Sequence, residues 1–216
     1  DLSTQTSLDA GTRNRDGLIG TLIESNKDIV VNSGSSNGSF HIGGARDYGI
    51  DQIVELSKVG NEYILVKGDG DNGWENILVV AHENATEISV FGSSNTTQTI
   101  DAGEYYLIEG DLCSTDRNMY ISTNNDVFVY QGTGGGREAN QEMFFVPPIS
   151  CGSRGDVNNI PFINEIGTKE FNGAVSIVTR KDATIEINGL DLNSQPNGIN
   201  VNGPYDVPNK SEYVTY

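Results

Sequence analysis

One stretch, residues 76–108, constrains the fold most, because it is organised as four short strands joined by turns. Apolar, β-branched side chains fill residues 77–81, and residues 86–91 alternate between apolar and polar side chains. Gly, Asn, Ser and Asp residues separate these runs from two later ones at 97–100 and 105–108. Alternation with a period of two, β-branched enrichment and intervening turn residues are typical of an antiparallel β-meander.

The chain then repeats this pattern. Residues 79–90 match residues 177–188, and a predicted hairpin at 20–33 matches a second one at 119–131. Each repeat holds about eight strands in about 95 residues, which is the size of a β-sandwich and also of two four-stranded propeller blades. The sequence therefore predicts an all-β, antiparallel fold of β-sandwich-like units packed without a linker. Propeller-like blades are the alternative.

The repeats also predict how the chain is divided. Residues 1–18 would be the tail of a preceding unit, 19–110 a complete unit, and 111–216 a second unit truncated at its C-terminal side. A repeat unit does not bury its apolar face alone, so repeats cut at both ends suggest a piece of a longer array.

The net charge of −17 over 216 residues narrows the classes of partner. A field of this sign disfavours nucleic acid and anionic membranes, whose phosphates are negative as well. It suits a soluble extracellular protein, and equally a protein that binds divalent cations. No apolar run approaches the roughly 18 residues that a membrane-spanning helix needs.

The chain has two cysteines, Cys113 and Cys151. An even pair in an acidic, Asn-rich β protein predicts one disulfide formed in an oxidising compartment. Two unpaired, buried thiols are the alternative. The spacing of Cys and His does not resemble a zinc site.

A glycine-rich loop at residues 68–73 fits the pattern G-x-G-x-x-G, but a dinucleotide site needs a helix after the glycines, and here a strand follows. The same loop offers Asp69, Asp71 and Glu75 as oxygen ligands for Ca²⁺, although it is not an EF-hand. A solvated hairpin loop is the alternative. Trp74 is the best candidate for an exposed residue that stacks on a sugar, and a partly buried strand-end anchor is its alternative.

Further aromatic and titratable residues are candidates for ligand binding or catalysis. Tyr105 and Phe144 are expected in the core rather than on a binding surface. His41 and His82 are the two side chains that could act as a general base near neutral pH. The counterpart of His82 in the second repeat is Arg180, which favours a surface position over a catalytic one. The pattern H-E-x-x-H does not occur, and the one literal match to G-x-S-x-G, GSSNG at 34–38, lies in a Gly/Ser-rich loop. The chain is therefore predicted not to be an enzyme.

Several segments together resemble a known family, and the most specific are GARDYGIDQIVEL at 44–56 and ANQEMFFVPPISC at 139–151. They are similar to the IgGFc-binding-protein N-terminal domain, in the form found in large Bacteroidota cell-surface proteins that are often labelled gliding-motility-associated. The resemblance implies a secreted, all-β, multi-domain surface protein, often exported by the type IX system. The family has no agreed ligand site, so no residue receives a role from it, and immunoglobulin binding is not carried over.

These observations predict a non-catalytic, extracellular β module of a large bacterial cell-surface protein with an adhesive or scaffold role. The alternative is a lectin-like, glycan-binding module of a larger secreted protein. Expected partners are other domains of the same protein or of the surface machinery, with glycans and protein ligands as further candidates. Calcium is the one cofactor that the sequence suggests.

Overall fold

The computed structural model describes residues 19–38, 47–136, 139–150, 155, 165–166, 168–170, 174–194 and 198–216. Within these residues the chain is all-β and antiparallel, as the sequence predicts, with three short 3-10 turns and no α-helix. None of the described residues forms a helix long and apolar enough to cross a membrane.

The strands up to residue 145 are β1 (Val31–Gly38), β2 (Asp47–Ile53), β3 (Gly60–Val66), β4 (Ile77–Ala81), β5 (Thr86–Phe91), β6 (Asn95–Ile100), β7 (Tyr105–Ile108), β8 (Asn118–Gly136) and β9 (Ala139–Phe145). The later, shorter strands are β10 (Glu165–Ile166), β11 (Lys169–Glu170), β12 (Val178–Arg180), β13 (Glu186–Ile187), β14 (Leu190–Asp191), β15 (Tyr205–Asp206) and β16 (Tyr213–Thr215). The 3-10 turns are η1 (Leu56–Lys58), η2 (Gly110–Leu112) and η3 (Leu192–Ser194).

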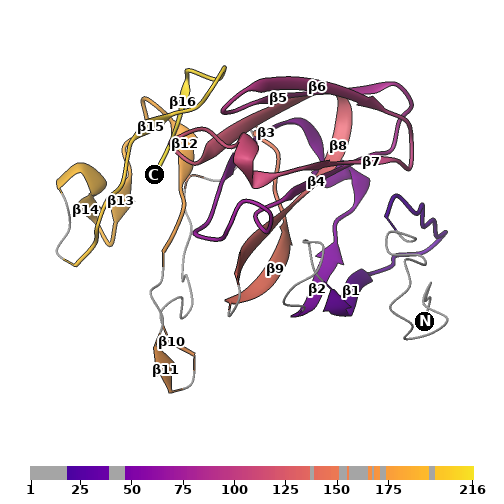
Figure 1. Ribbon diagram of the computed structural model, residues 1–216, viewed down its shortest axis with the longest axis horizontal. Coiled ribbons are helices and arrows are strands. Elements are labelled where there is room, and N and C mark those ends of the chain that lie inside the picture. The colour runs from indigo at the N-terminus through magenta and orange to yellow at the C-terminus, as the bar shows by residue number, and fades with distance from the viewer. Residues whose placement is uncertain are drawn as a thin grey trace.

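The main sheet has seven strands in the order β6-β5-β8-β4-β7, and both β3 and β9 also pair with β8 (Figure 1). The 19-residue strand β8 pairs with four other strands of this sheet. Its first part pairs with β3 and β5, its middle with β4, and its last part with β9. The predicted hairpin at 119–131 is therefore wrong: the expected turn at Asn124 and Asn125 is an irregularity within one strand, where the register with β3 shifts.

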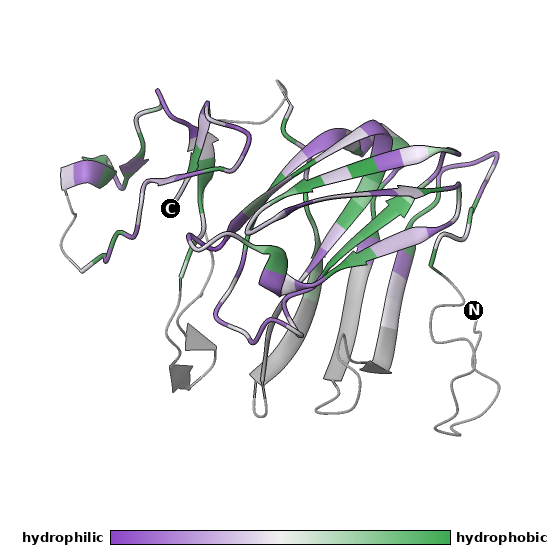
Figure 2. Cartoon of the chain, turned by 45° about the horizontal axis from the view of Figure 1, so that its top comes forward, coloured by the Kyte–Doolittle hydropathy of each residue, from purple (hydrophilic) through white to green (hydrophobic). Residues whose placement is uncertain are grey.

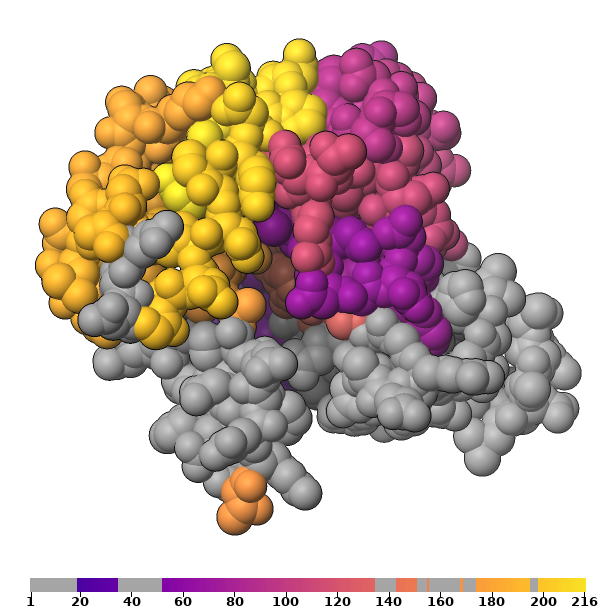
Figure 3. All heavy atoms as spheres, turned by 60° about the vertical axis from the view of Figure 1, so that its left-hand side comes forward, coloured from indigo at the N-terminus to yellow at the C-terminus, as the bar shows by residue number. Residues whose placement is uncertain are grey.

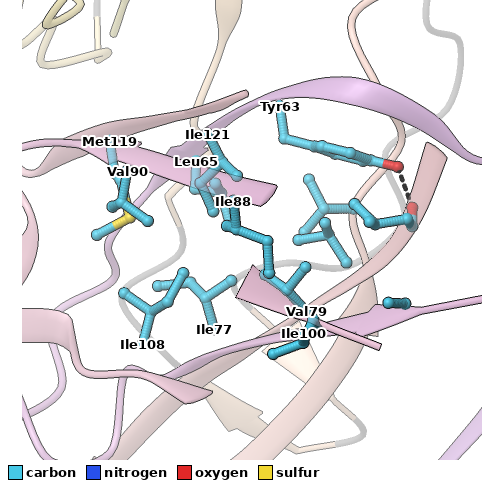
Figure 4. Packing of buried hydrophobic residues seen from close by; sticks show 14 of the residues in the cluster. Tyr63, Leu65, Ile77, Val79, Ile88, Val90, Ile100, Ile108, Met119 and Ile121 are labelled. Atoms are coloured by element: carbon cyan, nitrogen blue, oxygen red, sulfur yellow. Dashed lines mark hydrogen bonds between the residues drawn. The ribbon is translucent and has the colours of Figure 1, made fainter. Parts of the chain in front are cut away.

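The strands of the main sheet enclose the core. On β5 the buried side chains alternate, as Ile88 and Val90 show, and Figure 4 shows core side chains meeting from several strands. Tyr63 is buried among them, and its hydroxyl donates to the carbonyl oxygen of Val127 at 2.5 Å. Figure 2 shows hydrophobic residues along the strands of the main sheet and hydrophilic residues in the connections. The core residues are Tyr63, Leu65, Ile77, Val79, Ala81, Ile88, Val90, Ile100, Ile108, Cys113, Met119, Ile121, Val127, Val129 and Val146.

Strands from both sides of the predicted division at residues 110 and 111 pair in the main sheet, and the division itself stays a prediction. Strand β8 belongs to the predicted second unit, yet it is the middle strand of a sheet built from strands of the first. Core residues from both sides of the division, such as Val79 and Val129, lie directly opposite each other. Cutting the chain there would expose the core, because β3, β4 and β5 all pair with β8. The number and size of the repeats stay a prediction.

The C-terminal strands pack on the outer face of β3 and β8 (Figure 3). Ile64, Tyr120 and Val207 form a second buried cluster there. Lys210 bridges the two parts: its Nζ lies 2.6 Å from a Glu62 carboxylate oxygen and 5.3 Å from the centre of the Tyr120 ring. Burial lowers the pKa of Lys210, but its hydrogen bonds to Glu62 and Glu212 outweigh that effect and hold the pKa above its usual value.

Asn118 supplies the buried polar link between the two parts. Its Nδ2 donates to the Asp206 carbonyl at 3.1 Å and to the Thr215 hydroxyl at 2.9 Å. We expect Asn118→Ala to destabilise the chain by about 2–3 kcal/mol, because buried acceptors lose their donor. Amide hydrogen exchange should quicken in β16 more than in β4. The exposed control Asn95→Ala should leave both unchanged, and equal exchange in β16 of Asn118→Ala and wild type would contradict this link.

Candidate functional site

The glycine-rich loop that the sequence singled out, residues 68–73, is organised together with its flanking residues, up to 76, by one buried carboxylate. Only 1% of Glu75 is exposed. Its Oε2 accepts the backbone N–H of Gly68 at 2.8 Å, and its Oε1 accepts those of Gly70 and Gly134, both at 2.9 Å. Charge-assisted hydrogen bonds of this kind are stronger than neutral ones, so Glu75 fastens the loop both to itself and to β8.

Glycines in and near this loop leave room for the Glu75 side chain and for neighbouring backbone carbonyls. A Cβ atom at Gly68 would lie 2.7 Å from Oε1 of Glu75, and one at Gly70 would lie 2.5 Å from the Gly134 carbonyl oxygen. A Cβ at Gly110 would lie 2.6 Å from the Glu75 carbonyl oxygen. Only glycine allows this close approach. The G-x-G pattern therefore serves the chain's own Glu75, in the way that glycine-rich loops elsewhere admit a phosphate.

The predicted calcium ligands are not brought together. Glu75 points inward to the amides, whereas Asp69 lies at the surface with its Oδ1 2.7 Å from Nη1 of Arg117. The side chain of Asp71 is exposed, and its backbone carbonyl accepts the N–H groups of Trp74 and Glu75. No cluster of acidic, His or Cys side chains in the described part of the chain could hold a metal ion.

The aromatic residues also differ from expectation. Trp74 is only 8% exposed, so the prediction of an exposed stacking residue is wrong and the strand-end anchor is correct. Tyr105, expected in the core, is 38% exposed, and Phe144 is exposed as well.

The predicted disulfide is not supported, because none is found among the described residues. Cys113 is a free, buried thiol that follows η2 and packs among the core residues, and Cys151 lies outside the described residues. Burial raises the pKa of the Cys113 thiol to about 11. The thiol belongs to the same buried cluster as Ile108 and the other core residues.

Cys113 should therefore be unreactive in the folded protein. The thiolate is the reactive form, and a buried thiol with a raised pKa is almost entirely protonated at neutral pH. We expect a thiol reagent at pH 7.5 to leave Cys113 unmodified in native protein and to modify it after denaturation without reductant. Peptide mapping by mass spectrometry identifies the modified cysteine. An unreactive Cys113 in denatured, unreduced protein would contradict the free thiol.

His82 directly follows β4 and is partly buried. Its Nε2 lies 3.4 Å from Oε1 of the neighbouring Glu83, and its ring meets that of Phe128 edge-on. These contacts of His82 and Glu83 do not include a nucleophilic side chain. His41 lies outside the described residues.

Exposed apolar side chains are the feature that sequence reasoning missed. Tyr105 and Leu107 face outward on β7, next to a shallow, open depression lined by Ile19, Gly103, Glu104 and Tyr105. A second set lies in residues 20–30, where Leu22 is 78% and Val30 is 71% exposed. The sequence predicted a hairpin at 20–33 from its match to 119–131, but residues 21–30 form no strand. The short apolar runs are the signal that marks them.

Comparison with known proteins gives one match. None of the curated proteins and none of the solved structures matches the chain significantly. The family model described as IgGFc binding protein matches residues 3–216, which is nearly the whole chain. The all-β architecture agrees with the resemblance found in the sequence, and the chain belongs to the IgGFc binding protein family.

Proposed function

We propose that the chain is a non-catalytic, extracellular β module with an adhesive or scaffold role in a large cell-surface protein. One observation supports this most: the polar groups that the sequence offered for chemistry are used within the structure. Glu75 holds backbone amides, Asp69 pairs with Arg117, and Cys113 lies in the core. What the surface offers instead is exposed apolar side chains. The Bacteroidota, gliding-motility and type IX secretion context is part of the same proposal.

The surface that we assign to this role is the β7 surface, defined by Ile19, Glu104, Tyr105 and Leu107. Strand β7 ends the order β6-β5-β8-β4-β7, so it lies at a margin of the sheet. Its side chains alternate, and Tyr105 and Leu107 are the outward-facing, exposed ones. Aromatic and apolar residues rimmed by a carboxylate are typical of the centre of a protein interface.

A glycan is the second candidate ligand, and Tyr105 favours it. This aromatic ring is exposed beside the Glu104 carboxylate at the depression. Sugars are recognised by such pairs, because the ring stacks on C–H groups while the carboxylate accepts hydroxyl protons. Trp74, which the sequence offered for stacking on a sugar, is buried and does not contribute.

Surface plasmon resonance with two immobilised proteins, an immunoglobulin Fc fragment and mucin, tests the proposal, with a glycan array for the carbohydrate alternative. The Fc fragment is included because the family is named after it. We expect binding to a protein ligand, and Tyr105→Ser combined with Leu107→Ser to weaken it at least about tenfold. Leu56→Ser, an exposed apolar residue on η1, is the control. Binding to glycans alone would select the lectin, and equal binding by the double variant would rule out the β7 surface.

A further inference from the structure

The contact between the main sheet and the C-terminal strands has two polar anchors. We call strands β12–β16 with their connections the C-terminal part, and its contact with the outer face of β3 and β8 the joint. One anchor is Asn118 on β8, which donates to the Asp206 carbonyl and to the Thr215 hydroxyl. The other is Glu62 on β3, whose carboxylate lies 2.6 Å from Nζ of Lys210. Each anchor joins a side chain of the main sheet to the C-terminal part.

The two anchors lie well apart on the face that they share. Asn118 and Glu62 stand on either side of Ile64 and Tyr120, which are directly opposite each other on β3 and β8. The register of the two strands places the anchors four residue positions apart, which is about 13 Å at the rise of a β-strand. Two separate points of attachment fix a rotation that a single point would permit.

The apolar contacts of the joint attach the two parts without fixing their angle. Ile64, Tyr120 and Val207 form the buried cluster, and Phe91, Ile149 and Tyr213 pack against it. The attraction between apolar surfaces is not directional, so it holds such surfaces together while allowing them to slide and turn. The angle between the two parts therefore depends on the polar anchors.

Lys210 is the more demanding of the two anchors. Its side chain is only 17% exposed, and its Nζ also lies 3.3 Å from a carboxylate oxygen of Glu212. The Tyr120 hydroxyl donates to the same Glu62 oxygen that Lys210 contacts. The hydrogen bond from Lys210, and then that from Tyr120, lowers the pKa of Glu62, so the carboxylate stays charged. A partly buried ion pair adds little net stability, because its charges lose water, but it requires one geometry.

We propose that Lys210 fixes the angle between the main sheet and the C-terminal part, so that the chain is rigid across the joint. Asn118 and the apolar cluster attach the C-terminal part, and Lys210 selects one rotation about that attachment. A scaffold built in this way presents its exposed surfaces at set angles. That use rests on the scaffold role proposed above, whereas the fixed angle does not depend on the β7 surface.

Distances between two spin labels, measured by pulsed electron paramagnetic resonance, test the proposal on the intact chain. The labels are attached through Thr99→Cys on β6 and Glu186→Cys on β13, both exposed positions, with Cys151→Ser to remove the other reactive thiol. We expect one narrow distance in the otherwise unchanged chain. Lys210→Met keeps the length of the side chain without its charge, and it should make the distribution about twice as wide or add a second distance.

Lys181→Met is the matched control, because Lys181 pairs with Asp206 at 2.6 Å inside the C-terminal part and not across the joint. It should leave the distance narrow. Amide hydrogen exchange in β16 should be as slow in Lys210→Met as in wild type, since Asn118 still attaches the part. A broad distribution before any change at Lys210, or a narrow one in Lys210→Met, would overturn the proposal. So would fast exchange throughout β16 in Lys210→Met, which would make Lys210 an attachment and not a guide to the angle. None of these outcomes bears on binding at the β7 surface.

Discussion

Replacing Glu75 with alanine is expected to destabilise the folded chain by about 3–5 kcal/mol, because three buried backbone donors lose their acceptor at once. The donors are the N–H groups of Gly68, Gly70 and Gly134, which belong to two separate parts of the chain. The loop at 67–76 should detach from β8 as a consequence. Urea unfolding followed by tryptophan fluorescence measures the loss, since Trp74 is buried beside Glu75.

Two further variants separate the charge from the shape. Glu75→Gln keeps the volume and one acceptor oxygen but presents an N–H₂ group to backbone donors, so it should cost about 2 kcal/mol. Asp71→Ala removes an exposed carboxylate from the same loop and should change the free energy of unfolding by less than about 0.5 kcal/mol. The assignment fails if Glu75→Ala is no less stable than Asp71→Ala.

The chain should lose stability steeply at alkaline pH through two buried groups. Burial raises the pKa of the Cys113 thiol from 9.0 to about 11 and that of the Tyr63 hydroxyl from 10.0 to about 12. A raised pKa means that the unfolded chain loses the proton first. The stabilising effect is therefore complete below the unfolded pKa and disappears as pH rises through the folded one. Each shift corresponds to roughly 3 kcal/mol.

Single variants show which of the two groups causes the loss of stability in each pH range. Cys113→Ala should remove the pH dependence between about pH 9 and 11, and Tyr63→Phe the dependence between about pH 10 and 12. Urea unfolding at half-unit pH steps measures both, and differences from wild type cancel the titration of lysines. A Cys113→Ala variant with the same slope as wild type from pH 9 to 10 would show that the thiol is not buried in the folded state.

The strands of the central meander could be located from the sequence. Residues 77–81 and 86–91, expected as strands, are strands β4 and β5 with the same bounds. The alternation of apolar and polar side chains is a local property that survives folding, because one face of each strand meets the core. The same alternation did not reveal that residues 119–131 are one strand. The Asn124–Asn125 turn signal is local, whereas the pairing of β8 with strands on both sides is not.

The candidate site shows where the sequence stops being informative. Asp69, Asp71 and Glu75 are equivalent as residue types, and nothing local distinguishes the carboxylate that is buried from the two that are exposed. The choice depends on the amide of Gly134, which lies 59 residues away along the chain. Likewise, Trp74 was expected to be exposed and is buried, whereas Tyr105 was expected to be buried and is exposed. The burial of each ring depends on which segments cover it.

The sequence by itself determined the all-β class, the positions of the central strands, the repeated pattern and the family. These rest on side-chain periodicity and turn chemistry, which act over a few residues. The tertiary structure alone decided that β8 joins both predicted units, that Cys113 is an unpaired core thiol, and that Glu75 is an internal anchor. Each of those depends on contacts between residues far apart in the chain, where the pairing of strands fixes which side chains are enclosed.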